Sequence, residues 1–129
     1  MKTLERQIIF DKFDGRCAYC GCELTKGWHV DEIEPIRRNW KVVNGRKVFT
    51  GCQHPERLTI ENQNPSCPSC NINKHSEPLE QFRKNIAAYM KHLNEVSTQY
   101  KIAKRYGLVE ETGKPVLFYF ETLKTKEEK

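Results

Sequence analysis

The sequence has no long apolar segment, no internal repeat and no low-complexity stretch. Because no apolar run approaches about 20 residues, a membrane-spanning helix is not expected. The first six residues, MKTLER, lack the apolar stretch and the small-residue cleavage site of a secretory signal. We therefore expect a cytoplasmic protein that does not enter a membrane.

The chain is also short, and its excess of positive charge is small. Its 129 residues suit one domain, and 37% hydrophobic residues allow only a modest core. It has 22 Lys and Arg residues against 17 Asp and Glu residues, a net charge of +5. This excess is compatible with a polyanionic partner but does not identify one.

Four of the six cysteines form two CxxC pairs, Cys17 with Cys20 and Cys67 with Cys70. In a cytoplasmic protein such pairs are typical of metal ligands rather than of disulfides. Two pairs of thiolates complete the closed tetrahedral shell of a structural zinc. The separation between the pairs exceeds the usual zinc-ribbon spacing. We therefore expect one structural zinc and an inserted segment within residues 21–66.

Two cysteines, Cys22 and Cys52, fall outside these pairs. With His54 they would offer three ligands for a second metal, whereas a closed zinc site takes four. The alternatives are a second metal site and two free thiols, and the sequence favours free thiols.

Local patterns in the first half of the chain predict three elements. Apolar residues at helical spacing predict a helix within residues 3–14. Alternation of apolar and polar residues over 28–33, ended by Pro35, predicts a strand. The Asn44-Gly45 pair lies between two β-prone runs over residues 39–50 and predicts a hairpin, because both turn positions favour positive φ.

The middle of the chain is predicted to be a loop followed by a helix. Residues 51–66 are polar and rich in turn formers, which predicts a loop. An apolar stripe at i+3/i+4 spacing from Leu79 to Val96 predicts a helix, with Ser76 as its N-cap.

A C-terminal extension is expected over residues 99–124, after a core over residues 17–98. Within it we predict a short helix over 99–106 and a strand over 115–120. The charged residues 125–129 are expected to form a frayed tail. The whole chain is expected to be one domain.

Oxygen-bearing side chains suggest a second kind of metal site. Asp31 and Glu32 end the predicted strand, Asn62 precedes the second cysteine pair, and Asn71 follows it. Carboxylate and amide oxygens suit Mg²⁺ or Mn²⁺, with positions left open for water and phosphate. Such an ion can polarise a phosphodiester and stabilise the leaving oxygen.

These motifs together resemble those of HNH endonucleases, in particular the small members common in bacteriophages. The matching residues are Cys17-x-x-Cys20-Gly21, His29-Val30-Asp31-Glu32-Ile33-Glu34-Pro35, Glu61-Asn62 and Cys67-x-x-Cys70-Asn71-x-x-Lys74. Two later segments, over residues 105–110 and 118–121, also resemble the tails of phage-borne members. For a phage-encoded protein, the host cytoplasm would be the place of action.

The resemblance implies an α+β fold with a ββα-metal core, also called the His-Me finger. Asp31 and Asn71 would hold the catalytic Mg²⁺ or Mn²⁺, and Asn62 would brace a loop through backbone hydrogen bonds. The four-cysteine zinc would be structural. A helix would precede this core, and a helical extension ending in a strand would follow it.

One position departs from the family pattern, because Glu32 stands where the family usually has the catalytic His. A carboxylate, with an ordinary pKa of about 4.3, is a weaker base at neutral pH than imidazole. Three alternatives remain: Glu32 is the general base, or His29 on the same strand face as Asp31 replaces it, or the site is not catalytic.

Basic residues gather around the predicted hairpin and near the second cysteine pair. Those expected to contact nucleic acid are Arg37, Arg38, Lys41, Arg46, Lys47, Arg57 and Lys74. Since no sequence-reading module is present, we expect contacts with the backbone of double-stranded DNA and little base specificity. We expect a monomer or a weak homodimer.

The predicted function is a metal-dependent endonuclease that nicks or cuts DNA. The alternative is a non-catalytic, zinc-stabilised module that binds nucleic acid, which the Glu32 substitution favours.

Overall fold

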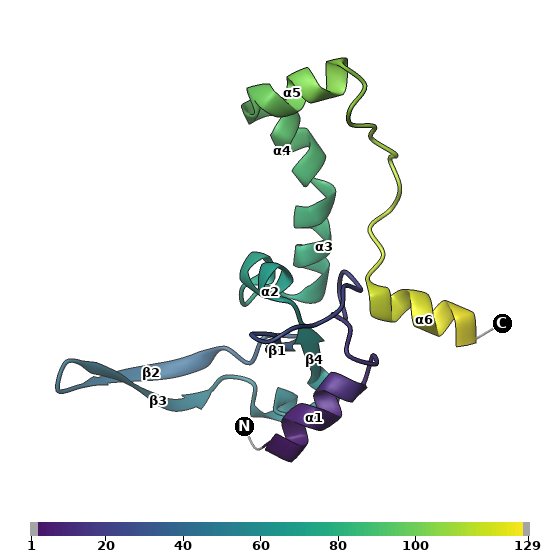
Figure 1. Ribbon diagram of the computed structural model, residues 1–129. Helices are drawn as coiled ribbons and strands as arrows, with labels where there is room; N and C mark the ends of the chain where they lie inside the picture. Colours follow the sequence, from purple (N-terminus) through teal and green to yellow (C-terminus); the bar gives the residue numbers. More distant parts are fainter. Residues whose placement is uncertain (1–2, 128–129) are drawn as a thin grey trace. The chain divides into compact units, whose positions relative to one another are not determined.

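A computed structural model describes residues 3–127, shown in Figure 1. Within this range it contains six α-helices and two sheets of two strands each, so the expected α+β architecture is confirmed. None of the helices in this range is long and apolar enough to cross a membrane.

The described chain divides into two compact units. The first comprises the residues up to Leu79 together with those from Phe118 onward, and the second comprises Glu80–Leu117. This division does not test whether either unit folds alone, so the single domain stays a prediction. The candidate site residues all belong to the first unit.

Two short strands and a helix form the centre of the first unit. β1 (His29–Glu32) confirms the predicted strand, and it pairs antiparallel with β4 (Gln63–Ser66). Asp31 lies opposite Asn64 in this register. The helix α2 (Pro68–Lys74) follows β4 directly and contacts β1.

The predicted loop over residues 51–66 is wrong in its last part, because β4 lies there. The segment Gln63-Asn64-Pro65-Ser66 has no β-prone side chain that would reveal a strand. Its pairing with β1 and the burial of its last three residues stabilise it instead. Two 3₁₀ turns, Pro55–Arg57 and Ile60–Asn62, precede it.

The predicted hairpin is confirmed as β2 (Arg38–Val43) and β3 (Arg46–Cys52). Asn44 and Gly45 form the turn with φ of 52° and 76°, as a two-residue turn of this kind requires. The pairing shifts register between Asn39 and Trp40.

The N-terminal helix is confirmed as α1 (Thr3–Asp11), which buries Ile9. α2 begins within the second cysteine pair. The Cys67 Sγ accepts a hydrogen bond from the Cys70 backbone N–H at 3.4 Å, and Pro68 occupies the first turn.

The helix predicted after Ser76 begins later and is interrupted. His75 has a φ of 53°, and the first residue of α3 (Leu79–Ala87) lies four positions further on. The Ala88 N–H is shared between the carbonyls of Lys84 and Asn85, both at 3.1 Å, and α4 (Tyr89–Val96) follows. The short helix predicted next is confirmed as α5 (Thr98–Arg105).

The strand predicted over residues 115–120 is wrong. Residues 109–118 have no regular structure, and α6 (Tyr119–Glu127) begins within the predicted strand. The N–H groups of Tyr119 and Phe120 donate to carbonyls of the first cysteine loop rather than to a strand. The Glu121 carboxylate accepts from the Phe118 N–H at 2.8 Å and so caps the helix start.

The frayed tail expected over residues 125–129 is helical as far as Glu127. The last two residues of that expected tail lie outside the described range.

The Phe118 side chain is the anchor of this C-terminal segment and is 1% exposed, whereas the neighbouring Leu117 is 61% exposed. Its ring lies 5.5 Å from the ring of Tyr19. We therefore expect Phe118→Ala to lower the free energy of unfolding by about 3–5 kcal/mol. Leu117→Ala, the matched control, should change it by less than about 0.5 kcal/mol. Urea denaturation would measure both, and equal losses would contradict the anchoring role.

Candidate functional site

The four predicted zinc ligands come together. The Sγ atoms of Cys17, Cys20, Cys67 and Cys70 all lie within 4.8 Å of one another, and those of Cys20 and Cys67 are 3.8 Å apart. A tetrahedral zinc with bonds of about 2.3 Å to sulfur needs sulfurs about 3.8 Å apart. The donor set and its spacing therefore fit a structural zinc.

Backbone hydrogen bonds preform the first cysteine loop. The Cys17 N–H donates to the Cys22 carbonyl at 2.8 Å, and the Gly21 N–H donates to the Cys17 carbonyl at 3.0 Å. The Ala18 N–H donates to the Pro65 carbonyl of β4 at 2.9 Å. These bonds fix the loop against the strand that leads into the second cysteine pair.

Close spacing and burial shift the pKa values of the Cys17, Cys20 and Cys70 thiols in opposite directions. A hydrogen bond with Cys70 lowers the pKa of the Cys17 thiol to about 4. The same hydrogen bond, and then burial, raise the pKa of Cys70, and burial raises that of Cys20. Neighbouring thiolates repel one another, and the charge of a bound zinc would offset that repulsion.

The two remaining cysteines do not assemble a second metal site. Among the described residues, the four-cysteine cluster is the one group of three or more His, Cys, Asp or Glu side chains with metal-binding spacing. Cys22 and Cys52 form no disulfide and lie outside this group, and burial, followed by interaction with the nearby Cys20 and Cys67, raises the pKa of the Cys22 thiol.

Asp31 is held by two side chains. It is 4% exposed, and its Oδ2 accepts hydrogen bonds from the Tyr19 hydroxyl at 2.5 Å and from the Lys74 Nζ at 3.1 Å. Lys74 is fully buried and also donates to the carbonyls of Glu32 at 2.8 Å and Glu77 at 3.0 Å. The Oδ1 atom accepts no hydrogen bond from the described part of the chain.

The two side chains that contact Asp31, those of Tyr19 and Lys74, belong to the two cysteine-bearing segments. Tyr19 lies between the two cysteines of the first pair, and Lys74 is the last residue of α2, which begins at the second pair. A metal that joins the two pairs would therefore fix the two donors relative to each other. The position of Asp31 is coupled to the cysteine cluster through these two hydrogen bonds.

The charge state of Asp31 is set by opposing effects. Burial raises the pKa of this carboxyl, and the Lys74 charge and the Tyr19 hydrogen bond oppose that rise. The pKa of Tyr19 is raised, first by burial and then by the charge of Asp31. The ammonium of Lys74 thus offsets much of the cost of burying the carboxylate.

Two clefts adjoin Asp31. One, of about 470 Å³, brings four predicted site residues together, His29, Asp31, Glu32 and Asn71. The other, of about 400 Å³, shares Asp31 and Glu32 and continues to Arg37, Arg38 and Trp40 at the start of the hairpin. His75 and Ser76, at the end of α2, line both clefts.

The residue in the position of the usual catalytic histidine already has a partner. Glu32 Oε1 accepts a hydrogen bond from the Arg38 guanidinium at 2.7 Å, and the Glu32 side chain is 18% exposed. His29, two positions before Asp31, is exposed at the edge of the larger cleft. Asn71 is half-buried, and its side chain makes no hydrogen bond with any described residue.

Asn62 makes the bracing contacts that the resemblance implies. Its Nδ2 donates to the carbonyls of Glu34 at 2.9 Å and Arg57 at 3.0 Å, and its Oδ1 accepts from the Glu34 N–H at 3.0 Å. Its own carbonyl accepts from the Ile33 N–H at 2.8 Å. Asn62 therefore fixes the turn after β1 through backbone contacts.

The residues expected to bind nucleic acid fall into two groups. Those in the first group are exposed along or beside the hairpin: Arg37, Arg38, Lys41, Arg46 and Lys47. In the second group, Arg57 donates to the Pro35 carbonyl at 2.7 Å, which braces the same turn as Asn62. Lys74 corrects the expectation, because a fully buried ammonium with three oxygen partners does not reach a phosphate.

The sequence interpretation did not identify Tyr19 as part of the site. The position of Tyr19 within the CxxC loop is the signal that could have placed it near the metal-linked segments. His75 directly follows Lys74, and this position favours a surface or phosphate-contacting residue near the site over an ion ligand; the turn that ends α2 places it at both clefts.

No family model, no curated protein and no solved structure matches the chain. The likeness to HNH endonucleases therefore stays an expectation based on the motifs.

The four-cysteine cluster predicts one tightly bound zinc per chain. We expect Cys70→Ser to lose this zinc and to lower the midpoint of thermal unfolding, because it removes one of four thiolates. Cys22→Ser and Cys52→Ser are matched controls, and both should keep one zinc. Atomic emission on purified protein measures the stoichiometry. Loss of zinc from either control would contradict the ligand set.

The buried pair of Asp31 and Lys74 predicts a pH-dependent stability defect. Lys74→Met should lower the free energy of unfolding by about 3–5 kcal/mol at neutral pH, because it leaves a carboxylate buried without its counter-charge. The pKa of Asp31, already raised by burial, should rise further. The folded variant then holds a proton that the unfolded chain releases above its ordinary pKa of 3.8.

Its stability should therefore fall as the pH rises from about 4 towards neutral, by up to about 1.4 kcal/mol per pH unit. Denaturation of Lys74→Met and wild type across this range measures the difference. The double variant Asp31→Asn with Lys74→Met should not show the added pH dependence. A pH-independent defect in Lys74→Met alone would contradict the buried pair.

Proposed function

We propose that this chain is an HNH-type endonuclease that hydrolyses phosphodiester bonds in DNA with a divalent metal ion. The observation that carries the proposal is the meeting of Asp31 and Asn71 in one cleft. They come from β1 and from α2, the helix that follows the partner strand of β1. This strand–strand–helix order agrees with the ββα-metal core that the motifs imply.

The residues of the cleft fit a hard divalent cation. Asp31 keeps Oδ1 without a hydrogen-bond donor, and the Asn71 amide is also without a partner among the described residues. Asp31 and Asn71 would hold Mg²⁺ or Mn²⁺, and the bound ion would stabilise charge on the leaving oxygen. The four cysteines would hold a separate, structural zinc.

Tyr19 and Lys74 are positioning residues in this proposal. Their hydrogen bonds occupy Oδ2 of Asp31, which leaves Oδ1 as the atom available to a ligand. Lys74 also donates to the Glu32 carbonyl, so the backbone at the end of β1 is held by the same ammonium. The site is thereby preorganised before substrate binds.

Three side chains at the clefts can accept a proton from the attacking water. Glu32 lies beside Asp31, but one of its carboxylate oxygens already accepts from Arg38 at 2.7 Å. His29 is exposed at the same cleft and carries no such partner in the described structure. His75 lines both clefts.

One observation favours the alternative, a zinc-stabilised binding module without catalysis. Asp31 is buried and already paired with an internal cation, as a purely structural carboxylate would be. In that case the clefts would bind phosphate without cleaving it. The two functions differ in a single readout, metal-dependent strand cleavage.

Asn71→Ala tests the catalytic function without breaking the buried ion pair. We expect wild-type protein to relax supercoiled plasmid with Mg²⁺ or Mn²⁺, and Asn71→Ala to lower the rate at least tenfold by removing an ion ligand. Asn73→Ala, two positions along the same helix and exposed, is the matched control. Zinc content should stay unchanged in both.

Absence of cleavage by folded, zinc-loaded wild type with either ion would overturn the endonuclease and favour the binding module. If cleavage occurs, Glu32→Gln, His29→Gln and His75→Gln in the same assay identify the proton acceptor. The variant with the largest loss, at unchanged DNA affinity, marks the general base.

A further inference from the structure

One segment of the chain carries positive charge and no negative charge. Residues 36–55 contain five Arg and Lys residues and no Asp or Glu. Their charge of +5 equals that of the whole protein, which leaves 17 basic and 17 acidic residues elsewhere. The hairpin of β2 and β3 occupies most of this segment. A second segment, residues 83–109, also has a net charge of +5, from six Arg and Lys residues against Glu95, so the hairpin is one of two basic regions that can attract a polyanion.

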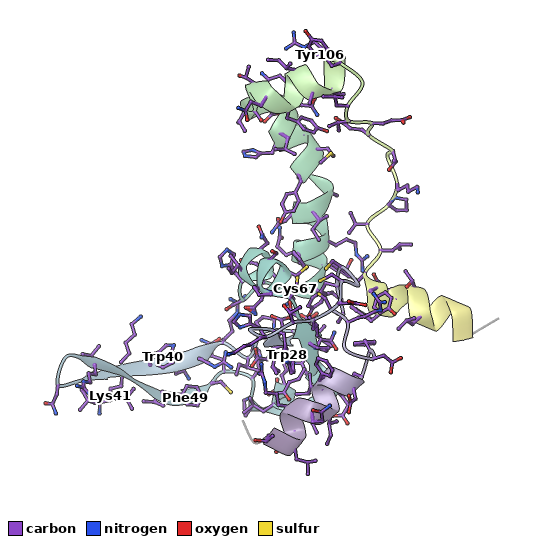
Figure 2. All side chains as sticks on the ribbon, viewed as in Figure 1. Trp28, Trp40, Lys41, Phe49, Cys67 and Tyr106 are labelled. Carbon is purple, nitrogen blue, oxygen red and sulfur yellow. The ribbon has the colours of Figure 1, made fainter. Side chains whose placement is uncertain are left out.

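The hairpin presents cations and apolar groups on both of its faces. Every residue of β2 is exposed, and so are the β3 residues that pair with its last four positions. The cross-strand register places Trp40, Val42, Lys47 and Phe49 on one face and Lys41, Val43, Arg46 and Val48 on the other. Figure 2 shows Trp40, Lys41 and Phe49 along this ribbon.

The rings of Trp40 and Phe49 pack edge to face at 5.7 Å, and both remain about half exposed, at 54% and 49%. This pair stiffens the ribbon at one point of its length. Exposed aromatic rings beside cations, with no carboxylate among them, suit a partner that offers phosphates and the edges or methyl groups of bases.

The dimensions of the hairpin favour double-stranded DNA over other polyanions. Two paired strands lie about 4.8 Å apart, and the major groove of B-form DNA, about 12 Å wide, admits such a ribbon. The six residues of β2 span about 20 Å, over which a duplex presents about twelve phosphate charges. The major groove of A-form RNA is too narrow for side chains to read.

The hairpin is also continuous with the candidate active site. Arg37, Arg38 and Trp40 line the cleft that also contains Asp31 and Glu32. A duplex held along the ribbon would therefore place its backbone next to the cleft. The same duplex could therefore be bound by the hairpin and cleaved in the cleft.

We propose that the β2–β3 hairpin is a DNA-binding ribbon that enters the major groove of double-stranded DNA. Its role in bringing a phosphodiester to the cleft rests on the proposed function, whereas the binding itself does not. Lys41, Arg46 and Lys47 provide the phosphate contacts of the outer part of the ribbon, and the exposed apolar side chains face the groove.

The test measures binding of zinc-loaded protein to a labelled duplex, without added Mg²⁺ or Mn²⁺, across a series of salt concentrations. The test variant combines Lys41→Gln, Arg46→Gln and Lys47→Gln. The control removes an equal number of positive charges from α3, α4 and α5 by combining Lys84→Gln, Lys91→Gln and Arg105→Gln. Both variants should keep one zinc per chain.

Each phosphate contact contributes about 0.9 to the slope of log affinity against log salt concentration. The hairpin variant should therefore flatten the slope by about 2.7 and bind about 100-fold more weakly at roughly 0.1 M salt. The control variant should stay within about twofold of wild type. If the triple variant loses zinc, the three single variants give the same test. Each of them should flatten the slope by about 0.9.

Several outcomes would overturn the proposal that the hairpin binds the major groove of DNA. Equal losses in both variants would mean that binding follows net charge rather than the hairpin. Equal or tighter binding of single-stranded DNA or duplex RNA would exclude the major groove of DNA as its target. Wild-type self-association that disappears in Trp40→Ala, without duplex binding, would make the hairpin a contact between copies of this chain.

The proposal of a DNA-binding ribbon and the proposal of an endonuclease can be refuted separately. Hairpin-dependent duplex binding without cleavage by any ion would support the ribbon and overturn the endonuclease. Ion-dependent cleavage that the triple variant retains at full rate and affinity would overturn the ribbon and leave the endonuclease standing.

Discussion

The Asp31 carboxylate is the group on which the rest of the site depends. It is buried, and one of its oxygens is held by a hydroxyl and an ammonium that come from the two cysteine-bearing segments. A charge in this position is tolerated only while both donors stay in place. The cysteine cluster that joins the two segments is therefore a condition for the geometry of Asp31 as well as for the stability of the fold.

This dependence agrees with the small apolar core of the first unit. Its fully buried side chains include Ile9, Ile36 and Phe118, and larger apolar residues such as Trp40 and Phe49 stay exposed on the hairpin. A core of this size contributes little beyond the conformational entropy lost on folding. The Asn62 bracing contacts and the buried ion pair supply order that packing alone would not, and a zinc bound by the four cysteines would add to it.

Sequence patterns predicted the parts whose structure follows from local chemistry. The turn at Asn44-Gly45 requires positive φ, and CxxC spacing is typical of metal ligands, so the hairpin and the four-cysteine cluster could both be inferred from neighbouring residues. The strand at Gln63–Ser66 and the helix at Tyr119 could not. The first is stabilised by pairing with a distant strand, and the second by docking of Phe118 and Phe120 against the first cysteine loop.

For the candidate site, too, some features follow from the sequence and others only from the tertiary structure. The sequence by itself determined which oxygen and sulfur donors are present, and that the segment from Ile36 to Pro55 has five basic residues and no acidic one. Only the tertiary structure decided that Lys74 points inward to Asp31, that Arg38 pairs with Glu32 and that His75 lines the clefts. Charge and ligand type belong to a residue and are visible in its letter. Burial and pairing depend on what distant segments place beside it, and no local pattern contains that information.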